Sequence, residues 1–305
     1  MPVKLDGVNL RTATFTPEKS LELLQIACRA ADLDPSGAYL LRHHTNAVYR
    51  LAHQPVVVKI TRPGAGRERS ARTVAIAEAL TRTGVPAVRL WPGLYQPVSV
   101  ANSYATFWIA VDVIRKPAAA DLAEPLHRLH HLDPGGLPVL PKLDPFGAIT
   151  SSLARPTVLD PQDLGFLRTY AEQLADDYAT LDFEQPTCLI HGDAHHSNTL
   201  FGSEGPVLAD WESARLGPPE WDLVTLAVHC RRFDHPRGEY EELVKLYGRD
   251  VRAWPGYQIL AAVRELRMIT TNAWKSTPGS PAATEVLGRI AALRHGDVEH
   301  RWTLL

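Results

Sequence analysis

The feature that most restricts the fold is a change in sequence pattern near Lys116. Before it, the β-branched and aromatic residues typical of strands gather in three segments, at 38–51, 55–61 and 96–114. We expect one strand in each of the first two segments and a hairpin in the third. After Lys116 most segments have helical periodicity. A small antiparallel sheet followed by a larger helical part predicts an α+β fold of two lobes, residues 1–113 and residues 114–305.

Local signals fix where two of the helices begin. Thr16 followed by Pro17 has the form of an N-cap and a first helical residue, and predicts a helix that reaches about residue 31. Asp160 and Pro161 give the same signal for a long helix. The remaining predictions are helices at 67–83, 118–132 and in most of the chain after 221, with short strands at 187–193 and 205–212.

Composition excludes several classes of protein. Hydrophobic residues make up 45% and charged residues 22% of the 305 residues, which is typical of folded globular proteins. A formal net charge of −2 gives no overall field for holding nucleic acid. The amino terminus lacks the apolar segment of a secretory signal, and no apolar run is long enough to span a membrane. Three cysteines without a CxxC pair fit reduced thiols. We therefore expect a cytoplasmic monomer or homodimer.

The densest chemical signal is the segment Leu-Ile-His-Gly-Asp-Ala-His-His-Ser-Asn at 189–198. Phosphoryl transfer needs a group that orients the attacking hydroxyl, oxygen ligands for Mg²⁺ and a cation on the donor phosphates. His191, Asp193 and Asn198 have the H-x-D-x-x-x-x-N spacing at which an Asp accepts the hydroxyl proton and an Asn binds metal. Asp210 follows in the next predicted strand, where a second acidic ligand is expected. The spacing predicts a phosphotransferase with Asp193 as the catalytic base.

A metal-hydrolase interpretation competes with this one. His191 and His195 are four residues apart, the spacing that places two zinc ligands on one helical face. Gly192 and the apolar strand before it argue against a helix there, and no third ligand motif follows. We interpret His195 and His196 as residues that order the loop. The histidines of the helix at 118–132, which are His127, His130 and His131, are interpreted as packing or surface residues.

His-Gly-Asp-Ala-His-His-Ser-Asn, followed by Ala-Asp-Trp-Glu and Gly-Pro-Pro-Glu-Trp-Asp-Leu, resembles the aminoglycoside phosphotransferase and choline kinase superfamily, whose fold is like that of protein kinases. The resemblance extends from about residue 44 to residue 229. It implies ATP- or GTP-dependent O-phosphorylation of a small molecule. It also implies that Asn198 and Asp210 hold Mg²⁺ and that Asp222 braces the catalytic loop.

The same resemblance assigns nucleotide contacts in the first lobe. Lys59 would reach the α- and β-phosphates, and Glu68 is the favoured carboxylate partner of that lysine, because Thr73 occupies the position where the family usually has a Glu. The phosphate-covering segment 42–49 contains no glycine, so its backbone contact must come from residues such as Asn46. The remaining nucleotide contacts that the resemblance implies are the hinge residues Val111 and Val113 and, beyond the hinge, Leu200.

The acceptor is less constrained than the reaction. A polycationic aminoglycoside needs a pocket rich in carboxylates, but the segments at 230–237 and 263–267 place arginines among the acidic residues. This mixture fits a neutral or zwitterionic alcohol equally well, such as a sugar, an amino alcohol or another antibiotic hydroxyl. The alternative to an enzyme is a nucleotide-binding, kinase-like regulator without phosphotransfer activity.

Overall fold

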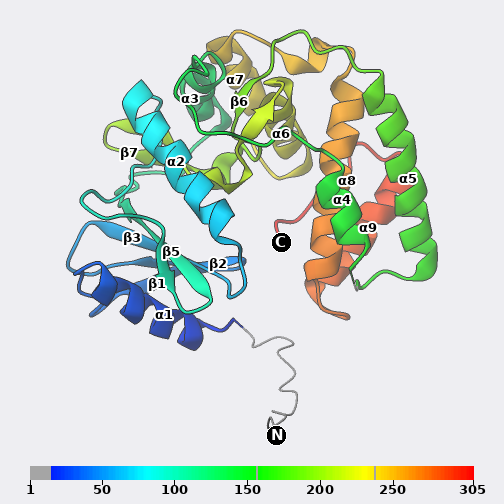
Figure 1. Ribbon diagram of the computed structural model, residues 1–305. Coiled ribbons are helices and arrows are strands. Elements are labelled where there is room, and N and C mark those ends of the chain that lie inside the picture. The colour runs from blue at the N-terminus through cyan, green and yellow to red at the C-terminus, as the bar shows by residue number, and fades with distance from the viewer. Residues whose placement is uncertain (1–14, 156, 237) are drawn as a thin grey trace, which may run out of the picture. The chain divides into compact units, whose positions relative to one another are not determined.

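The computed structural model describes residues 15–155, 157–236 and 238–305 (Figure 1). Residues 1–14, for which we expect no secretory signal, lie outside the described part. The chain divides into two compact units. The first runs to Thr81 and resumes at Val88–Val111, and the second comprises Arg82–Ala87 and Asp112–Leu305.

The first unit is built on a five-stranded antiparallel sheet with the strand order β1-β2-β3-β5-β4. Its elements are α1 (Pro17–Ala30), β1 (Tyr39–His43), β2 (Asn46–Arg50), β3 (Val56–Thr61), α2 (Arg67–Thr83), β4 (Val98–Val100) and β5 (Ser103–Ile109). The expected single strand at 38–51 is wrong, because the chain turns at His44 and Thr45 into a hairpin. His44 N–H donates to the carbonyl of Asn46 across this turn, and the polar residues there interrupt the apolar pattern of the segment.

Helix α1 covers one face of this sheet. Tyr49, Val58 and Phe107 lie opposite one another on β2, β3 and β5, and all three are buried in the same cluster as Leu24 and Cys28 of α1. Because successive side chains of a strand point to opposite faces, the next residue of β3 faces away from this core. That residue is Lys59, which is how the sheet presents the predicted phosphate-binding lysine on the face that α1 does not cover.

The second unit is mainly helical. Its long helices are α3 (Ala123–His130), α5 (Pro161–Ala179), α6 (Glu220–Arg232), α7 (Glu239–Tyr247), α8 (Tyr257–Lys275) and α9 (Pro281–Arg294), with the shorter α4 (Gly147–Leu153) and η1 (Ala119–Leu122). Four short strands lie among them: β6 (Cys188–Ile190), β7 (Thr199–Gly202), β8 (Gly205–Leu208) and β9 (Arg215–Gly217). β6 pairs with β9 and β7 with β8. The two strands predicted here are therefore four.

Helices α6 and α8 form the centre of this unit. Helix α6 is buried along nearly its whole length, and α8 packs against α4, α5, α6 and α9. Glu265 of α8 accepts hydrogen bonds from Arg231 and Arg232 at the end of α6, at 2.6 Å each. These contacts fix the position of α8 beside α6, and so decide which α8 side chains reach the loop at the start of α6.

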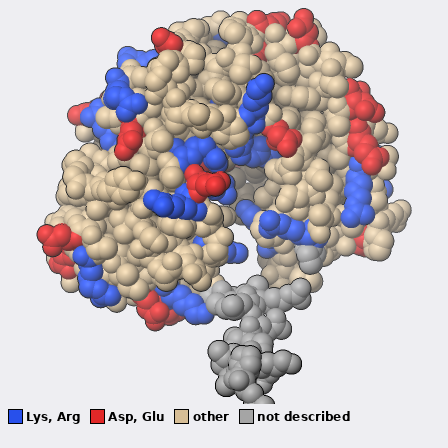
Figure 2. All heavy atoms as spheres, viewed as in Figure 1, with Lys and Arg blue, Asp and Glu red and all other residues tan. Residues whose placement is uncertain are grey.

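Two surface features agree with the composition. On the face shown in Figure 2, lysine and arginine side chains are interspersed with aspartate and glutamate rather than gathered into a field of one sign. Across the described residues, no helix has both the length and the apolar character that crossing a membrane requires.

Candidate functional site

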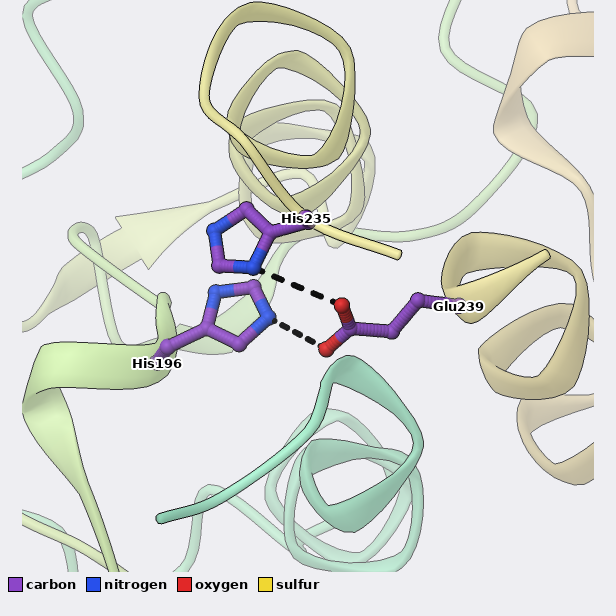
Figure 3. A group of neighbouring side chains, drawn as sticks. All are labelled: His196, His235 and Glu239. Carbon is purple, nitrogen blue, oxygen red and sulfur yellow. Dashed lines mark hydrogen bonds and ion pairs between the residues drawn. The ribbon is translucent and has the colours of Figure 1, made fainter. Parts of the chain in front are cut away.

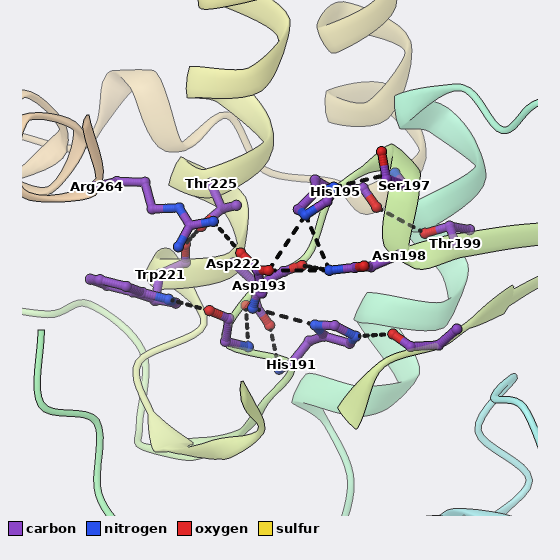
Figure 4. A network of polar contacts seen from close by, with 12 residues as sticks. His191, Asp193, His195, Ser197, Asn198, Thr199, Trp221, Asp222, Thr225 and Arg264 are labelled. Carbon is purple, nitrogen blue, oxygen red and sulfur yellow. Dashed lines mark hydrogen bonds and ion pairs between the residues drawn. The ribbon is translucent and has the colours of Figure 1, made fainter. Parts of the chain in front are cut away.

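The loop that follows β6 is anchored by one buried carboxylate (Figure 4). Asp222, in the first turn of α6, accepts the backbone N–H of His191 at 2.7 Å and that of Gly192 at 2.9 Å. The residue is fully buried. A carboxylate near the amino terminus of a helix is also favoured by the helix dipole. The predicted bracing of this loop by Asp222 is thus confirmed as a contact.

Gly192 is required by the space at this point. Its φ of +78° lies in the left-handed region, and a Cβ there would lie 2.2 Å from the carbonyl oxygen of Ser213. On the other side, the indole Nε1 of Trp221 donates to the Gly192 carbonyl at 3.1 Å. The backbone just before Asp193 is therefore held between α6 and the 213 segment with no room for a side chain.

His130 completes the anchor, in a role that its sequence pattern does not predict. Its Nε2 donates to Asp222 at 3.1 Å, and its Nδ1 accepts the Tyr247 hydroxyl at 2.8 Å. The prediction of a packing or surface residue is correct for the burial and wrong for the chemistry. The contact joins residues 92 positions apart, so no local pattern announces it.

The carboxylate of Asp193 receives groups from two directions. Arg264 of α8 forms an ion pair with its Oδ1. Asn198 Nδ2 lies 3.2 Å from its Oδ2, and His195 Nε2 lies 3.5 Å from the same oxygen. Burial acts to raise the pKa of this carboxyl, but Arg264 and His195 outweigh burial and hold the pKa well below its usual value. Asp193 is therefore an anion throughout the neutral range.

The predicted metal ligands Asn198 and Asp210 lie on adjacent backbone segments. The Asn198 carbonyl accepts the N–H of Ala209, the residue before Asp210, at 2.8 Å. Strand β7 begins directly after Asn198, and its first residue, Thr199, pairs with Leu208 at the end of β8. Asp210 has a left-handed backbone, with φ of +67°. An amide oxygen and a carboxylate are hard oxygen donors, which is the chemistry that Mg²⁺ prefers. These two residues fit a magnesium ion.

The zinc-hydrolase interpretation does not fit the loop. His191 and His195 do not share a helical face, since residues 191–195 are irregular and precede only a short 3-10 turn. His191 Nε2 donates to the Ala209 carbonyl at 2.8 Å and its Nδ1 accepts the Asp193 N–H at 3.3 Å. His195 Nδ1 accepts the Ser197 N–H at 3.2 Å as an N-cap. Both imidazoles order the loop.

A second histidine group ties the loop to α7 (Figure 3). His196 Nε2 donates to Glu239 at 2.8 Å, and His235 Nδ1 lies 3.4 Å from the other oxygen of that carboxylate. Glu239 also accepts the Ala119 N–H at 2.6 Å. The two rings stack at 3.8 Å with planes 16° apart. A ring nitrogen binds a metal in the plane of its ring, so two parallel rings do not direct their nitrogens at one ion. We therefore interpret this group as a structural contact that holds the loop against α7.

The residues assigned to the nucleotide are distributed over both units. Lys59 is half-buried on β3, opposite Val48 and Thr106, and Asn46 is buried at the start of β2. Glu68 is exposed in the first turn of α2. Val111 and Val113 lie in irregular backbone after the end of β5. Leu200 lies on β7, opposite Val207 of β8. Their roles stay predictions.

Helix α8 supplies two residues that are not among the predicted site residues. Arg264 contacts Asp193, and Arg267 lies one turn further along the helix. The signal for them was present as two arginines at i and i+3 in a helical segment, which predicts one shared face. From the sequence these arginines indicate only that the acceptor pocket is not dominated by carboxylates. Which loop that face would meet depends on contacts across 71 positions of sequence.

Residues 40–260 match the phosphotransferase enzyme family. No curated protein matches the chain in sequence.

Solved structures match over most of both chains. A choline/ethanolamine kinase family protein from Mesorhizobium loti is 19% identical, covers 91% of this chain and 98% of its own, and superposes with a TM-score of 0.63. A choline kinase from Streptococcus pneumoniae is 16% identical with a TM-score of 0.65, over 88% and 96%. An aminoglycoside phosphotransferase from Streptomyces rimosus is 20% identical with a TM-score of 0.57, over 81% and 98%. At these identities the likeness shows the fold, and the predicted kinase-like α+β fold is confirmed.

Proposed function

Because the chain belongs to the phosphotransferase enzyme family, we propose that it transfers the γ-phosphoryl group of ATP or GTP to a hydroxyl group of a small molecule. The observation that carries this proposal is the arrangement around Asp193. Its carboxylate lies beside Asn198, on a loop that Asp222 holds through two backbone N–H groups, with Asp210 on the adjacent segment. That set supplies the group that orients the attacking hydroxyl and the oxygen ligands for Mg²⁺ that phosphoryl transfer requires.

Asp193 orients the acceptor. As an anion it accepts a hydrogen bond from the attacking hydroxyl, and it takes the proton as the new oxygen–phosphorus bond forms. Its lowered pKa makes it a weak base, which suits a loose transition state in which the proton moves late. Arg264 fixes the carboxylate in place and is a positioning residue.

Asn198 and Asp210 hold Mg²⁺ in this proposal. Asn198 directs its amide N–H groups at the Asp193 carbonyl, at 2.9 Å, and at its carboxylate, at 3.2 Å, which leaves the amide oxygen to the cation. When bound, the ion neutralises charge on the donor phosphates. Supporting structures include an amicoumacin kinase in complex with AMP-PNP and Ca²⁺ and a spectinomycin phosphotransferase in complex with ADP.

We assign the remaining nucleotide contacts to the first unit, to Val113 just beyond it and to β7. Lys59 is the cation for the α- and β-phosphates, with backbone contact from Asn46. Val111 and Val113 offer backbone groups to the base, and Leu200 offers an apolar side chain. Glu68 is the proposed partner of Lys59 when nucleotide is bound.

The test is acceptor-dependent release of ADP or GDP across a panel of hydroxylated sugars, amino alcohols, hydroxy acids and antibiotics. The proposal expects release with at least one acceptor, and loss of that release when Mg²⁺ is chelated. Nucleotide binding without acceptor-dependent release across the panel would favour the kinase-like regulator. Equal affinity for ATP with and without Mg²⁺ would contradict the roles of Asn198 and Asp210.

A further inference from the structure

Helix α8 turns two guanidinium groups toward the catalytic loop. Arg264 and Arg267 are three residues apart and so share a face. Their guanidinium carbons lie 6.0 Å and 5.6 Å from the ring of Trp221. Trp221 is the residue whose indole holds the Gly192 carbonyl, next to Asp193. Figure 4 shows Arg264 reaching from α8 to the Asp193 carboxylate.

The two arginines differ in what neutralises them. Arg264 has Asp193 as its ion-pair partner. Within the described residues, the Arg267 guanidinium contacts the Trp221 ring and forms no hydrogen bond or ion pair. Burial lowers the pKa of Arg267 to about 10, with further lowering from the charges of Arg264 and Arg215, so the group remains a cation at neutral pH.

Nearby carboxylates do not serve Arg267. Asp193 is taken by Arg264. Asp144, the other acid that acts on Arg267, forms no ion pair with it, and its Oδ1 accepts the backbone N–H groups of Phe146 and Gly147 at 3.1 Å and 2.8 Å. Burying a cation without a counter-charge is costly. A site that keeps such a cation beside its catalytic aspartate is suited to receive an anion.

We propose that Arg267 binds a carboxylate or phosphate group of the acceptor whose hydroxyl meets Asp193. This inference rests on the proposed phosphotransferase function and names its substrate class, a hydroxylated anion or zwitterion rather than a polycation. The planar guanidinium offers paired donors that match either group, which lets it orient the acceptor as well as attract it.

The first test groups the acceptor panel by charge. D-glucuronate, D-glucose 6-phosphate, D-glucose and D-glucosamine present a carboxylate, a phosphate, no charge and a cation on one sugar frame, and matched hydroxy acids, their amides and amino alcohols extend the set. The best acceptor is expected to carry an anion, and comparing the two anionic arms identifies which. A best acceptor that is neutral or only cationic would overturn the inference and leave the phosphotransferase proposal standing.

The second test uses Arg267→Gln with Arg155→Gln as its matched control. Arg155 also lies over a tryptophan, with its guanidinium carbon 4.3 Å from the ring of Trp274, and is exposed. Loss of a charge-assisted pair should raise the acceptor KM about 10–100-fold in Arg267→Gln, with the KM for ATP unchanged. Arg155→Gln should behave as wild type. An unchanged acceptor KM in Arg267→Gln would count against the assignment.

A binding measurement separates the two proposals. With Mg²⁺ and AMP-PNP saturating the nucleotide site, inorganic phosphate is titrated calorimetrically into wild type and Arg267→Gln. Binding to wild type that Arg267→Gln loses would support the anion site even if no acceptor in the panel is phosphorylated, in which case only the proposed activity fails. No binding to wild type, or equal binding to both proteins, would refute the site.

Discussion

Arg232 and Arg267 belong to the two central helices of the second unit, α6 and α8, and each lies beside a tryptophan. The guanidinium of Arg232 donates to both oxygens of Glu265, at 2.6 Å and 2.9 Å, and to the carbonyls of Asp297, Val298 and His300. Arg267 has no such acceptors within the described chain. The same residue type thus has two roles in this unit. The charge of Arg232 is neutralised by Glu265 and stabilises the fold, whereas the charge of Arg267 is available to a ligand.

The aspartates show the same division. Asp222 is fully buried and its oxygens are occupied by two backbone N–H groups and by His130. Asp193 keeps a third of its side-chain surface exposed, at 33%, although Arg264 pairs with it. A carboxylate that only supports the fold has no reason to remain accessible. We infer that the exposed edge of Asp193 is where the acceptor hydroxyl approaches.

Among the substitutions that test this comparison, Asp193→Asn should have the largest effect, and the effect should be on kcat. Removing the anion that receives the hydroxyl proton is expected to lower kcat about 10²–10⁴-fold, while the dissociation constant for ATP stays within about twofold. Steady-state kinetics and calorimetry measure the two quantities. Asp176→Asn, at an exposed site on α5, is the control and should match wild type. A kcat near wild type in Asp193→Asn would remove Asp193 from the chemistry.

Arg232→Met should cost the most stability. Glu265 would keep Arg231 but lose its paired contact, and three backbone carbonyls would lose their donor. Breaking a buried ion pair from one side costs about 3 kcal/mol at the low end of measured cases. Urea denaturation measures the free energy of unfolding, and the acceptor KM should change little. A loss below about 1 kcal/mol would mean that the contacts of Arg232 with Glu265 and the three carbonyls do not stabilise the fold.

Arg267→Met should leave the free energy of unfolding unchanged or raise it, in contrast to Arg232→Met. The substitution removes a half-buried charge that has no ion-pair partner in the described chain, and the loss of contact with Trp221 offsets part of the gain. We expect the free energy of unfolding to be unchanged or raised by about 1 kcal/mol in the same urea experiment. A loss as large as that of Arg232→Met would show that Arg267 is a structural cation.

The smallest expected effect concerns pH. The pKa of Asp193 is lowered in the folded protein, so the stability that its ionisation contributes is complete above the unfolded pKa of about 4 and is lost as pH falls through the folded pKa. The difference in unfolding free energy between wild type and Asp193→Asn should therefore vary by less than about 0.5 kcal/mol from pH 5 to 8. Denaturation at several pH values in that range checks it, and a steep change near pH 6 would mean that Arg264 does not control this carboxyl.

Short-range signals were sufficient for much of the fold. Thr16 accepts the N–H of Lys19 and Asp160 that of Asp163, so both N-caps form as their residue types predict. The hairpin at His44 and Thr45 was missed because its turn has none of the Gly, Pro or Asn-Gly signals that mark tight turns. The extra strands β7 and β9 are three or four residues long, and such short segments are defined by pairing partners rather than by periodicity.

The candidate site divides in the same way. Asp193 and Asn198 are five residues apart, and a fixed spacing in one loop is readable from sequence. Arg264 reaches Asp193 across 71 positions and His130 reaches Asp222 across 92. Those partners are chosen by how α8 and α3 pack, which no local pattern encodes. The residues that tune the site were therefore visible only in the structure.

The most direct test of the account follows the phosphoryl group itself. With nucleotide labelled at the γ-phosphate, label is measured in the acceptor that gives the greatest ADP or GDP release, for wild type and for Asp193→Asn. We expect stoichiometric transfer of label to a hydroxyl of the acceptor in wild type and about 10²–10⁴-fold slower transfer in the variant. Label that appears only in free phosphate, at the same rate in both proteins, would contradict it.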